Sequence, residues 1–113
     1  MARSFGERKL WMFVKGFRGR ANRCRILAYR GATKALLNAY IGRKLKKRDM
    51  RRLWITRIGA GTKEYGVNYS NFMRGLADDN IRLNRKSLSE LAMSEPVSFK
   101  ALVDRVKQMR GLQ

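Results

Sequence analysis

The sequence contains no histidine, one cysteine and one proline, and these shortages exclude several kinds of site. With no histidine, and with Cys24 alone, the chain offers neither a Cys/His zinc set nor an internal disulfide. An acid–base pair would have to come from carboxylates or lysines, and the short glycine motifs match no nucleotide-binding loop. We therefore expect no enzyme activity, no metal site and no cofactor.

Long apolar runs are also absent. The longest uncharged apolar run near the start, LWMFV at residues 10–14, is far too short to span a bilayer. It also lacks the longer apolar core and the small-residue cleavage site of a secretory signal. We expect an intracellular or organellar protein with no membrane partner and no small-molecule substrate.

Acidic residues are scarce: 27 Lys and Arg stand against 8 Asp and Glu, which gives a formal net charge of +19. Residues 1–57 hold 18 of the basic and 2 of the acidic residues, and residues 58–113 hold 9 and 6. A charge this far from zero repels itself in a compact fold, so a polyanion is the first partner to consider. The asymmetry predicts an anion-binding extension at residues 1–57 and a small domain at residues 58–113.

The spacing of apolar residues predicts an all-α protein, because no segment shows the alternation of a strand. We expect an irregular start near Gly16 and Gly19, with helix from about Ala21. One long helix is predicted from Ala32 towards Lys63, with a bend near Gly42.

Three short helices are predicted over residues 66–80, 83–93 and 94–109, with Asn68, Asn84 and Ser94-Glu95-Pro96 at their starts. Their apolar stripes and the end of the long helix should share one core, which makes a globular domain of three to four helices. The stripes consist of Tyr69, Phe72, Met73 and Leu76, then Leu88, Leu91 and Ala92, then Phe99, Leu102, Val103 and Val106.

The densest positive charge lies in RKLKKRDMRRLWITRI, residues 43–58. On a helix, the cations before Met50 point nearly all the way round the axis, so no side is left for a protein core. From Met50 onward, an apolar stripe opens that runs through Leu53, Trp54 and Ile58. The helix is therefore predicted to leave a polyanion and enter a protein core, with Trp54 at the changeover. Arginines interleaved with aromatic residues favour a folded RNA as that polyanion.

Four motifs follow one another along the chain: KGFRGRANRCR at 15–25, KRDMRRLWITRI at 47–58, GVNYSNFMRGL at 66–76 and NIRLNRKSLSELA at 80–92. In this order they resemble the family of the bacterial-type large-subunit ribosomal protein number twenty, over about residues 15–107. The resemblance implies a long basic helical extension that threads the large-subunit rRNA, followed by a small helical domain. It also implies a structural role in the large subunit and its assembly, with rRNA and neighbouring large-subunit proteins as partners.

The resemblance, carried over residue by residue, implies a set of rRNA contacts, to which the basic pattern adds Arg30, Arg43 and Lys44. The implied contacts are Lys15, Arg18, Arg20, Arg23 and Arg25, then Lys47, Arg48, Arg51, Arg52, Trp54 and Arg57, then Tyr69, Ser70, Asn71, Asn84, Arg85 and Lys86. In the last group, capping and surface polarity explain the residues nearly as well.

The chain also departs from the family pattern. It begins with the short, partly apolar MARSFGERKLWMFV where the family has a longer Arg/Lys-rich tail, and it has Ile41-Gly42 where the family tends to have Arg-Asp. The shortened tail looks most like mitochondrial members, so we expect a ribosome of the mitochondrial matrix, with a plastid or bacterial cytoplasmic ribosome as the alternative. The alternative function is an architectural, nucleoid-type DNA-binding protein, although the sequence shows neither minor-groove wedges nor a dimer face.

Overall fold

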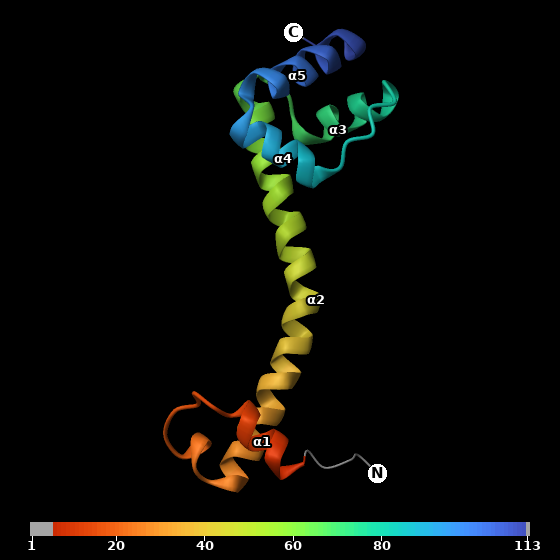
Figure 1. Cartoon of the computed structure of the whole chain (residues 1–113). Coiled ribbons are helices and arrows are strands. Elements are labelled where there is room, and N and C mark those ends of the chain that lie inside the picture. Colours follow the sequence, from red (N-terminus) through yellow and green to blue (C-terminus); the bar gives the residue numbers. More distant parts are fainter. Residues whose placement is uncertain (1–5, 113) are drawn as a thin grey trace. The chain divides into compact units, whose positions relative to one another are not determined.

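A computed structural model describes residues 6–112. Its elements are α1 (Glu7–Phe13), a 3₁₀ helix (Gly19–Asn22), α2 (Arg25–Glu64), α3 (Tyr69–Asp78), α4 (Arg85–Ser94) and α5 (Pro96–Arg110) (Figure 1). The part of the chain that the structure describes contains no strand, so the all-α prediction is confirmed. The chain divides into two compact units, Met1–Lys46 and Lys47–Gln113.

The long helix is confirmed, and it begins earlier than predicted. Helix α2 runs without interruption from Arg25, through the predicted start at Ala32 and through Gly42. The preceding segment is irregular, as predicted, with Gly16 at φ +88° and Gly19 at φ +62°. Only glycine adopts such angles readily, so these two positions let the chain turn between α1 and α2.

Helix α1 was not among the predicted elements. Its Leu10, together with Val14 just beyond its end, is buried against Ala28 and Ala32 of α2, and Trp11 and Phe17 pack around them. Leu10 and Val14 are four residues apart, as are Ala28 and Ala32, so each pair lies on one side of its helix. The partly apolar start of the chain therefore folds onto the first turns of α2.

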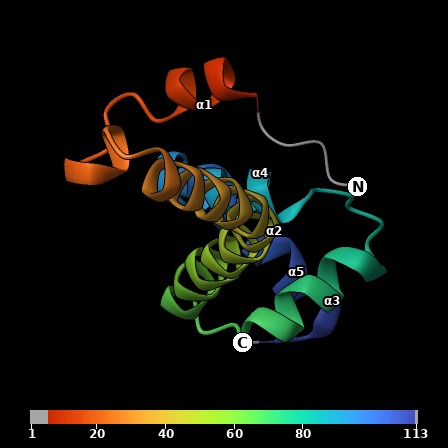
Figure 2. The same cartoon turned by 90° about the horizontal axis from the view of Figure 1, so that it is seen from below.

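The second unit has its own core, to which the end of α2 and all three short helices contribute. Helix α5 packs against both α3 and α4, and Figure 2 shows α5 beside α3. The rings of Phe72 in α3 and Phe99 in α5 lie 5.5 Å apart between centroids, within the range of favourable aromatic pairs. The fully buried members are Ile58, Val67, Phe72, Leu76, Leu88, Phe99, Val103 and Val106.

Most of the predicted stripes and starts of the short helices are confirmed. Every predicted stripe residue is buried in this core or packs against it. The Asn84 side chain accepts a hydrogen bond from the Ser87 N–H at 2.8 Å, and Pro96 is the first residue of α5. Asn68 precedes α3 as predicted, but its side chain makes no capping hydrogen bond.

Two glycines in the second unit are explained by helix packing. A Cβ on Gly61 of α2 would lie 2.9 Å from Phe99 Cε1, and a Cβ on Gly75 of α3 would overlap Val106 of α5. The missing side chains therefore let the helices approach closely. Gly61, which weakens a helix in isolation, strengthens the packing of this one.

Candidate nucleic-acid interface

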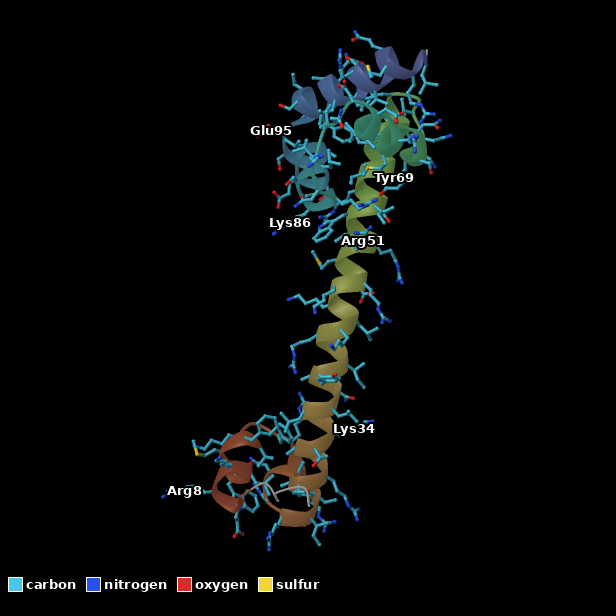
Figure 3. The ribbon with its side chains drawn as sticks, turned by 90° about the vertical axis from the view of Figure 1, so that its right-hand side faces the viewer. Arg8, Lys34, Arg51, Tyr69, Lys86 and Glu95 are labelled. Atoms are coloured by element: carbon cyan, nitrogen blue, oxygen red, sulfur yellow. The ribbon has the colours of Figure 1, made fainter. Side chains whose placement is uncertain are left out.

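The middle of α2 has no buried side. In the first unit, every residue from Leu36 to Lys46 is exposed, and in the second unit so is every residue from Lys47 to Leu53. Figure 3 shows the side chains of this part of α2 extending outward from the ribbon. We call residues 36–53 the exposed run. The helix satisfies the backbone hydrogen bonds of this run internally. Its side chains are exposed, so they are available to contact a partner.

The exposed run carries almost no opposite charge. Its one acidic residue, Asp49, lies 3.9 Å from the guanidinium of Arg52, and such exposed pairs contribute little stability. The Lys44 ammonium lies 5.3 Å from the centre of the Tyr40 ring, a cation–π contact that leaves the other ring face exposed. The cations are Arg43, Lys44, Lys46, Lys47, Arg48, Arg51 and Arg52. The run therefore combines uncompensated positive charge with exposed apolar surface.

The core-facing stripe was predicted to open too early in the chain, at Met50. Met50 and Leu53 were expected on the core-facing stripe, but their side chains are 37% and 39% exposed. Trp54 is half-buried, and Ile58 is the first fully buried residue of α2 in this unit. Ile58 is also the first residue of α2 in the core that it shares with α3 to α5, so the apolar stripe begins before that core does. The stripe predicted the correct side of the helix and the wrong starting residue.

The cations of the first motif, and Arg30 after it, lie in the first unit. They are all exposed: Lys15, Arg18, Arg20, Arg23, Arg25 and Arg30. Among the described residues of this unit, only a loose ion pair, 4.0 Å between Arg25 Nε and Glu7 Oε1, offsets this charge. The backbone N–H of Leu27 lowers the pKa of the Cys24 thiol, and the nearby Arg20 guanidinium acts in the same direction. The first turns of α2 are therefore favourable for negative charge.

The predicted contacts in the second unit are partly occupied by interactions within the protein. Arg85 Nε donates a hydrogen bond to the Tyr69 hydroxyl at 2.7 Å, which joins the starts of α4 and α3. Asn84 caps α4, and the Asn71 carbonyl accepts from Arg110 at 3.4 Å. Ser70 and Lys86 remain exposed, and Figure 3 shows Lys86 at the surface of α4. Arg57 and Trp54 are half-buried.

Several exposed cations were not in the predicted set. Arg8 and Lys9 lie on α1, Lys34 lies on α2, and Lys46 lies inside the exposed run. Figure 3 shows Arg8 and Lys34 pointing away from the ribbon. Charge alone was the available signal for them, because they fall between the motifs that guided the prediction.

Two kinds of site were also sought among residues 6–112. No helix there combines the length and the apolar composition that crossing a membrane requires. No group of three or more Cys, Asp or Glu side chains in the same residues is arranged to hold a metal ion.

Comparison with known proteins agrees with the resemblance seen in the four motifs. A family model described as ribosomal protein L20 matches residues 2–102. The chain belongs to the ribosomal protein L20 family. The family prediction made from the four motifs is therefore confirmed, and the match covers both the exposed run and most of the second unit.

Three relatives illustrate the similarity, and each is named a large ribosomal subunit protein bL20. The chain is 49% identical to the protein of Elusimicrobium minutum over 108 residues, 96% of this chain and 92% of that protein. It is 46% identical to the protein of Thermosipho melanesiensis over 105 residues, 93% of this chain and 89% of that protein. It is 46% identical to the protein of Cytophaga hutchinsonii over 102 residues, 90% and 89% of the two chains.

These relatives bear on two earlier expectations. The L20 family is named for the ribosome and not for DNA packaging, so the nucleoid-type alternative has no support. All three relatives are bacterial, so they do not support the mitochondrial expectation, which stays a prediction.

Proposed function

We propose that this protein is a structural constituent of the large ribosomal subunit, which binds large-subunit rRNA and helps its assembly without catalysis. Family membership supports the ribosomal role, and the exposed run of α2 is the observation that supports rRNA as the binding partner. A helix that is basic on all sides and has no core-facing side is stable in a compact particle when RNA surrounds it.

Binding by the exposed run rests on two kinds of contact. Arginine guanidiniums pair with phosphate oxygens through two parallel hydrogen bonds, and lysine ammoniums act as point charges. Each neutralised phosphate releases counterions, so this affinity falls as salt rises. Exposed Tyr29 and Tyr40 offer ring faces on which unpaired bases can stack.

We place the boundary between the rRNA-contacting segment and the helical domain between residues 57 and 58. Residues 1–57 form the rRNA-contacting extension and residues 58–113 form the helical domain, a division supported by the full burial of Ile58. In the extension we assign rRNA contacts to the predicted cations from Lys15 to Arg57, together with Trp54. In the domain, Ser70 and Lys86 make direct contacts. Tyr69, Asn84 and Arg85 contact rRNA while holding the helix starts that position them. Asn71 contacts rRNA through its side chain, while its backbone carbonyl accepts from Arg110.

The ribosome concerned is that of the mitochondrial matrix, with a bacterial or plastid ribosome as the alternative. The partly apolar composition of LWMFV at residues 10–14 supports this assignment, because the family usually has Arg/Lys-rich sequence before its first motif. Fractionation of the source cells decides between these locations: the native protein should be recovered with large subunits from purified mitochondria. Recovery with cytoplasmic bacterial subunits instead would overturn the mitochondrial assignment and leave the ribosomal role intact.

Co-sedimentation tests the ribosomal role itself. In a sucrose gradient, the native protein should travel with large subunits and stay with them through a moderate salt wash. Binding of the purified chain to structured rRNA, with duplex DNA as competitor at matched salt, should favour the rRNA, since both complexes weaken as salt rises. Recovery of the native protein only free or on DNA would contradict the proposal.

A further inference from the structure

A groove along α4 differs in charge from the rest of this basic protein. It encloses about 640 Å³ on the outer side of α4 and at the corner where α4 meets α5. Its lining consists of three apolar side chains, two carboxylates and two serines, and no lysine or arginine lines it. We call it the α4 groove.

The helical spacing of α4 explains why these residues share one side. Leu83 precedes the helix. One face of the helix carries Ser87, Glu90, Leu91 and Ser94, because each lies three or four residues from another of them. The opposite face of α4 carries the buried Leu88 and Ser89. The groove therefore faces away from the core of the second unit.

The apolar part of the groove is available to a partner. Leu83 is 39% exposed and Met93 is 53% exposed, although both are large apolar side chains at the edge of a well-packed domain. Leu91 lies half-buried between the groove and the core. Exposed apolar side chains that cluster in a groove are typical of a protein contact, whereas single ones need no explanation.

The charged part of the groove indicates the kind of partner. The whole chain has 27 basic residues and only 8 acidic ones, yet Glu90 and Glu95 both lie in this groove. Within residues 6–112, neither carboxylate forms an ion pair, and Glu95 accepts only a hydrogen bond from the Ser98 hydroxyl at 3.2 Å. Figure 3 shows Glu95 at the end of α4 farther from Lys86. Phosphates would be repelled here, whereas lysine and arginine side chains would be attracted.

We propose that the α4 groove binds a basic segment of a neighbouring large-subunit protein, one that places an apolar side chain between flanking lysines or arginines. The apolar side chain packs on Leu83, Leu91 and Met93, and the flanking cations pair with Glu90 and Glu95. The inference rests on the proposed ribosomal role, which brings such neighbours within reach. It adds a protein-binding groove on α4 to the rRNA contacts proposed for the exposed run and for residues such as Lys86.

Photo-crosslinking in assembled large subunits tests the proposal. Ser94, which is exposed and lines the groove, is replaced by p-benzoylphenylalanine in the full-length chain, and the matched control carries the same replacement at exposed Gln108 of α5. Irradiation of purified subunits should join position 94 to another large-subunit protein, and mass spectrometry should place the crosslink in a Lys/Arg-rich segment. A crosslink from position 94 to rRNA, to an acidic segment, to a second copy of this chain or to nothing would overturn the proposal.

Charge reversal provides a second measurement. Glu90→Lys should reduce the protein crosslink from position 94 by about tenfold, because a cation would then face the basic segment. Asp104→Lys makes the same change of charge at an exposed site outside the groove and should leave the yield within about twofold of the unchanged chain. Equal yields in the two variants would contradict the role of Glu90. A chain that fails to enter subunits at all would instead count against the proposed ribosomal function, so the two failures are distinguishable.

Discussion

Two stretches of the same helix have the same backbone conformation and different surroundings. In the exposed run of α2, residues 36–53, no side chain is buried and the cations point in all directions. From Trp54 to Glu64, α2 buries Ile58 and Thr62 and brings Gly61 against Phe99. The first stretch is helical without a core-facing side, whereas the second is part of a core.

The difference shows that the distribution of apolar and charged residues over the sides of the helix, not helix propensity, decides whether a stretch packs against protein or contacts RNA. Both stretches contain good helix formers, and both contain large apolar residues. In the second stretch the apolar residues repeat on one side, where α3 to α5 cover them. In the exposed run, residues 36–42 carry no charge, and from Arg43 to Arg52 the cations lie on every side of the helix. No protein surface can cover that second part without burying unpaired charge. An RNA can cover both, because phosphates meet the cations while bases stack on the rings.

The strongest way to break the comparison is to truncate one aromatic residue in each region. Phe72 is fully buried, so Phe72→Ala should lower the free energy of unfolding by about 3 to 5 kcal/mol. Tyr40→Ala, in the exposed run, should change it by less than about 0.5 kcal/mol. Urea unfolding of the full-length chain measures both. Equal losses would mean that the exposed run belongs to a core as well.

Removing positive charge from the exposed run tests its role in rRNA binding. Replacing Arg48, Arg51 and Arg52 together by Gln should lower the magnitude of the slope of log affinity for rRNA against log salt by about 3, since each lost phosphate contact lowers it by nearly one. Stability of the free chain should stay within about 0.5 kcal/mol, because all three side chains are exposed.

The matched control for that variant removes three exposed cations outside the exposed run, Lys63, Arg82 and Lys100. Its total charge is the same, so a general electrostatic effect would change both slopes equally. We expect the control to keep most of the salt dependence. If the two triple variants behave alike, the exposed run has no special role in binding.

Trp54 tests where the two regions meet. The indole is half-buried, so Trp54→Ala should lower the free energy of unfolding by about 2 kcal/mol, less than the loss expected for a fully buried Trp. Leu53→Ala, one residue earlier and 39% exposed, should lower it by less than about 1 kcal/mol. Thermal or urea unfolding measures both. A loss of about 4 kcal/mol for Trp54→Ala would mean that Trp54 lies fully inside the core, so that the core begins nearer to Met50, where the apolar stripe was predicted to open.

The smallest expected effect concerns the ion pair between α5 and the end of α3. Arg105 donates two hydrogen bonds to Asp79, at 2.8 and 3.1 Å, and these bonds lower the pKa of that carboxyl. Because the folded-state pKa is lower than the unfolded value, the stabilisation is present above the unfolded pKa and is lost as pH falls through the folded one. Arg105→Gln should therefore reduce stability at pH 7 and match the unchanged chain in strong acid. A difference between the two chains that stays constant across the acid range would contradict this account.

Local signals were enough to predict several elements. The helical spacing of Phe72 and Leu76, and of Phe99, Val103 and Val106, identified the buried faces before any tertiary contact was known. Asn84 and Pro96 marked helix starts through hydrogen bonding and a fixed φ angle that involve only neighbouring residues. The cations of the candidate interface were found by charge and motif in the same way.

Other features depended on contacts between distant residues. Helix α1 was missed because Leu10 and Val14 gain their stability from Ala28 and Ala32, and a seven-residue helix has little stability alone. The pairing of Tyr69 with Arg85, residues that had been read as RNA contacts, appeared only when α3 and α4 were brought together.

The sequence by itself determined that this is an all-α, strongly basic member of the L20 family, because helical periodicity, net charge and motif order are all properties of neighbouring residues. The tertiary structure decided where α2 changes its surroundings, because burial depends on how far α3 to α5 reach along the helix. It also decided that Gly61 and Gly75 serve close packing, and that Glu90 and Glu95 share a groove free of cations. These features depend on which side chains lie side by side in space, and spacing along the chain does not specify that.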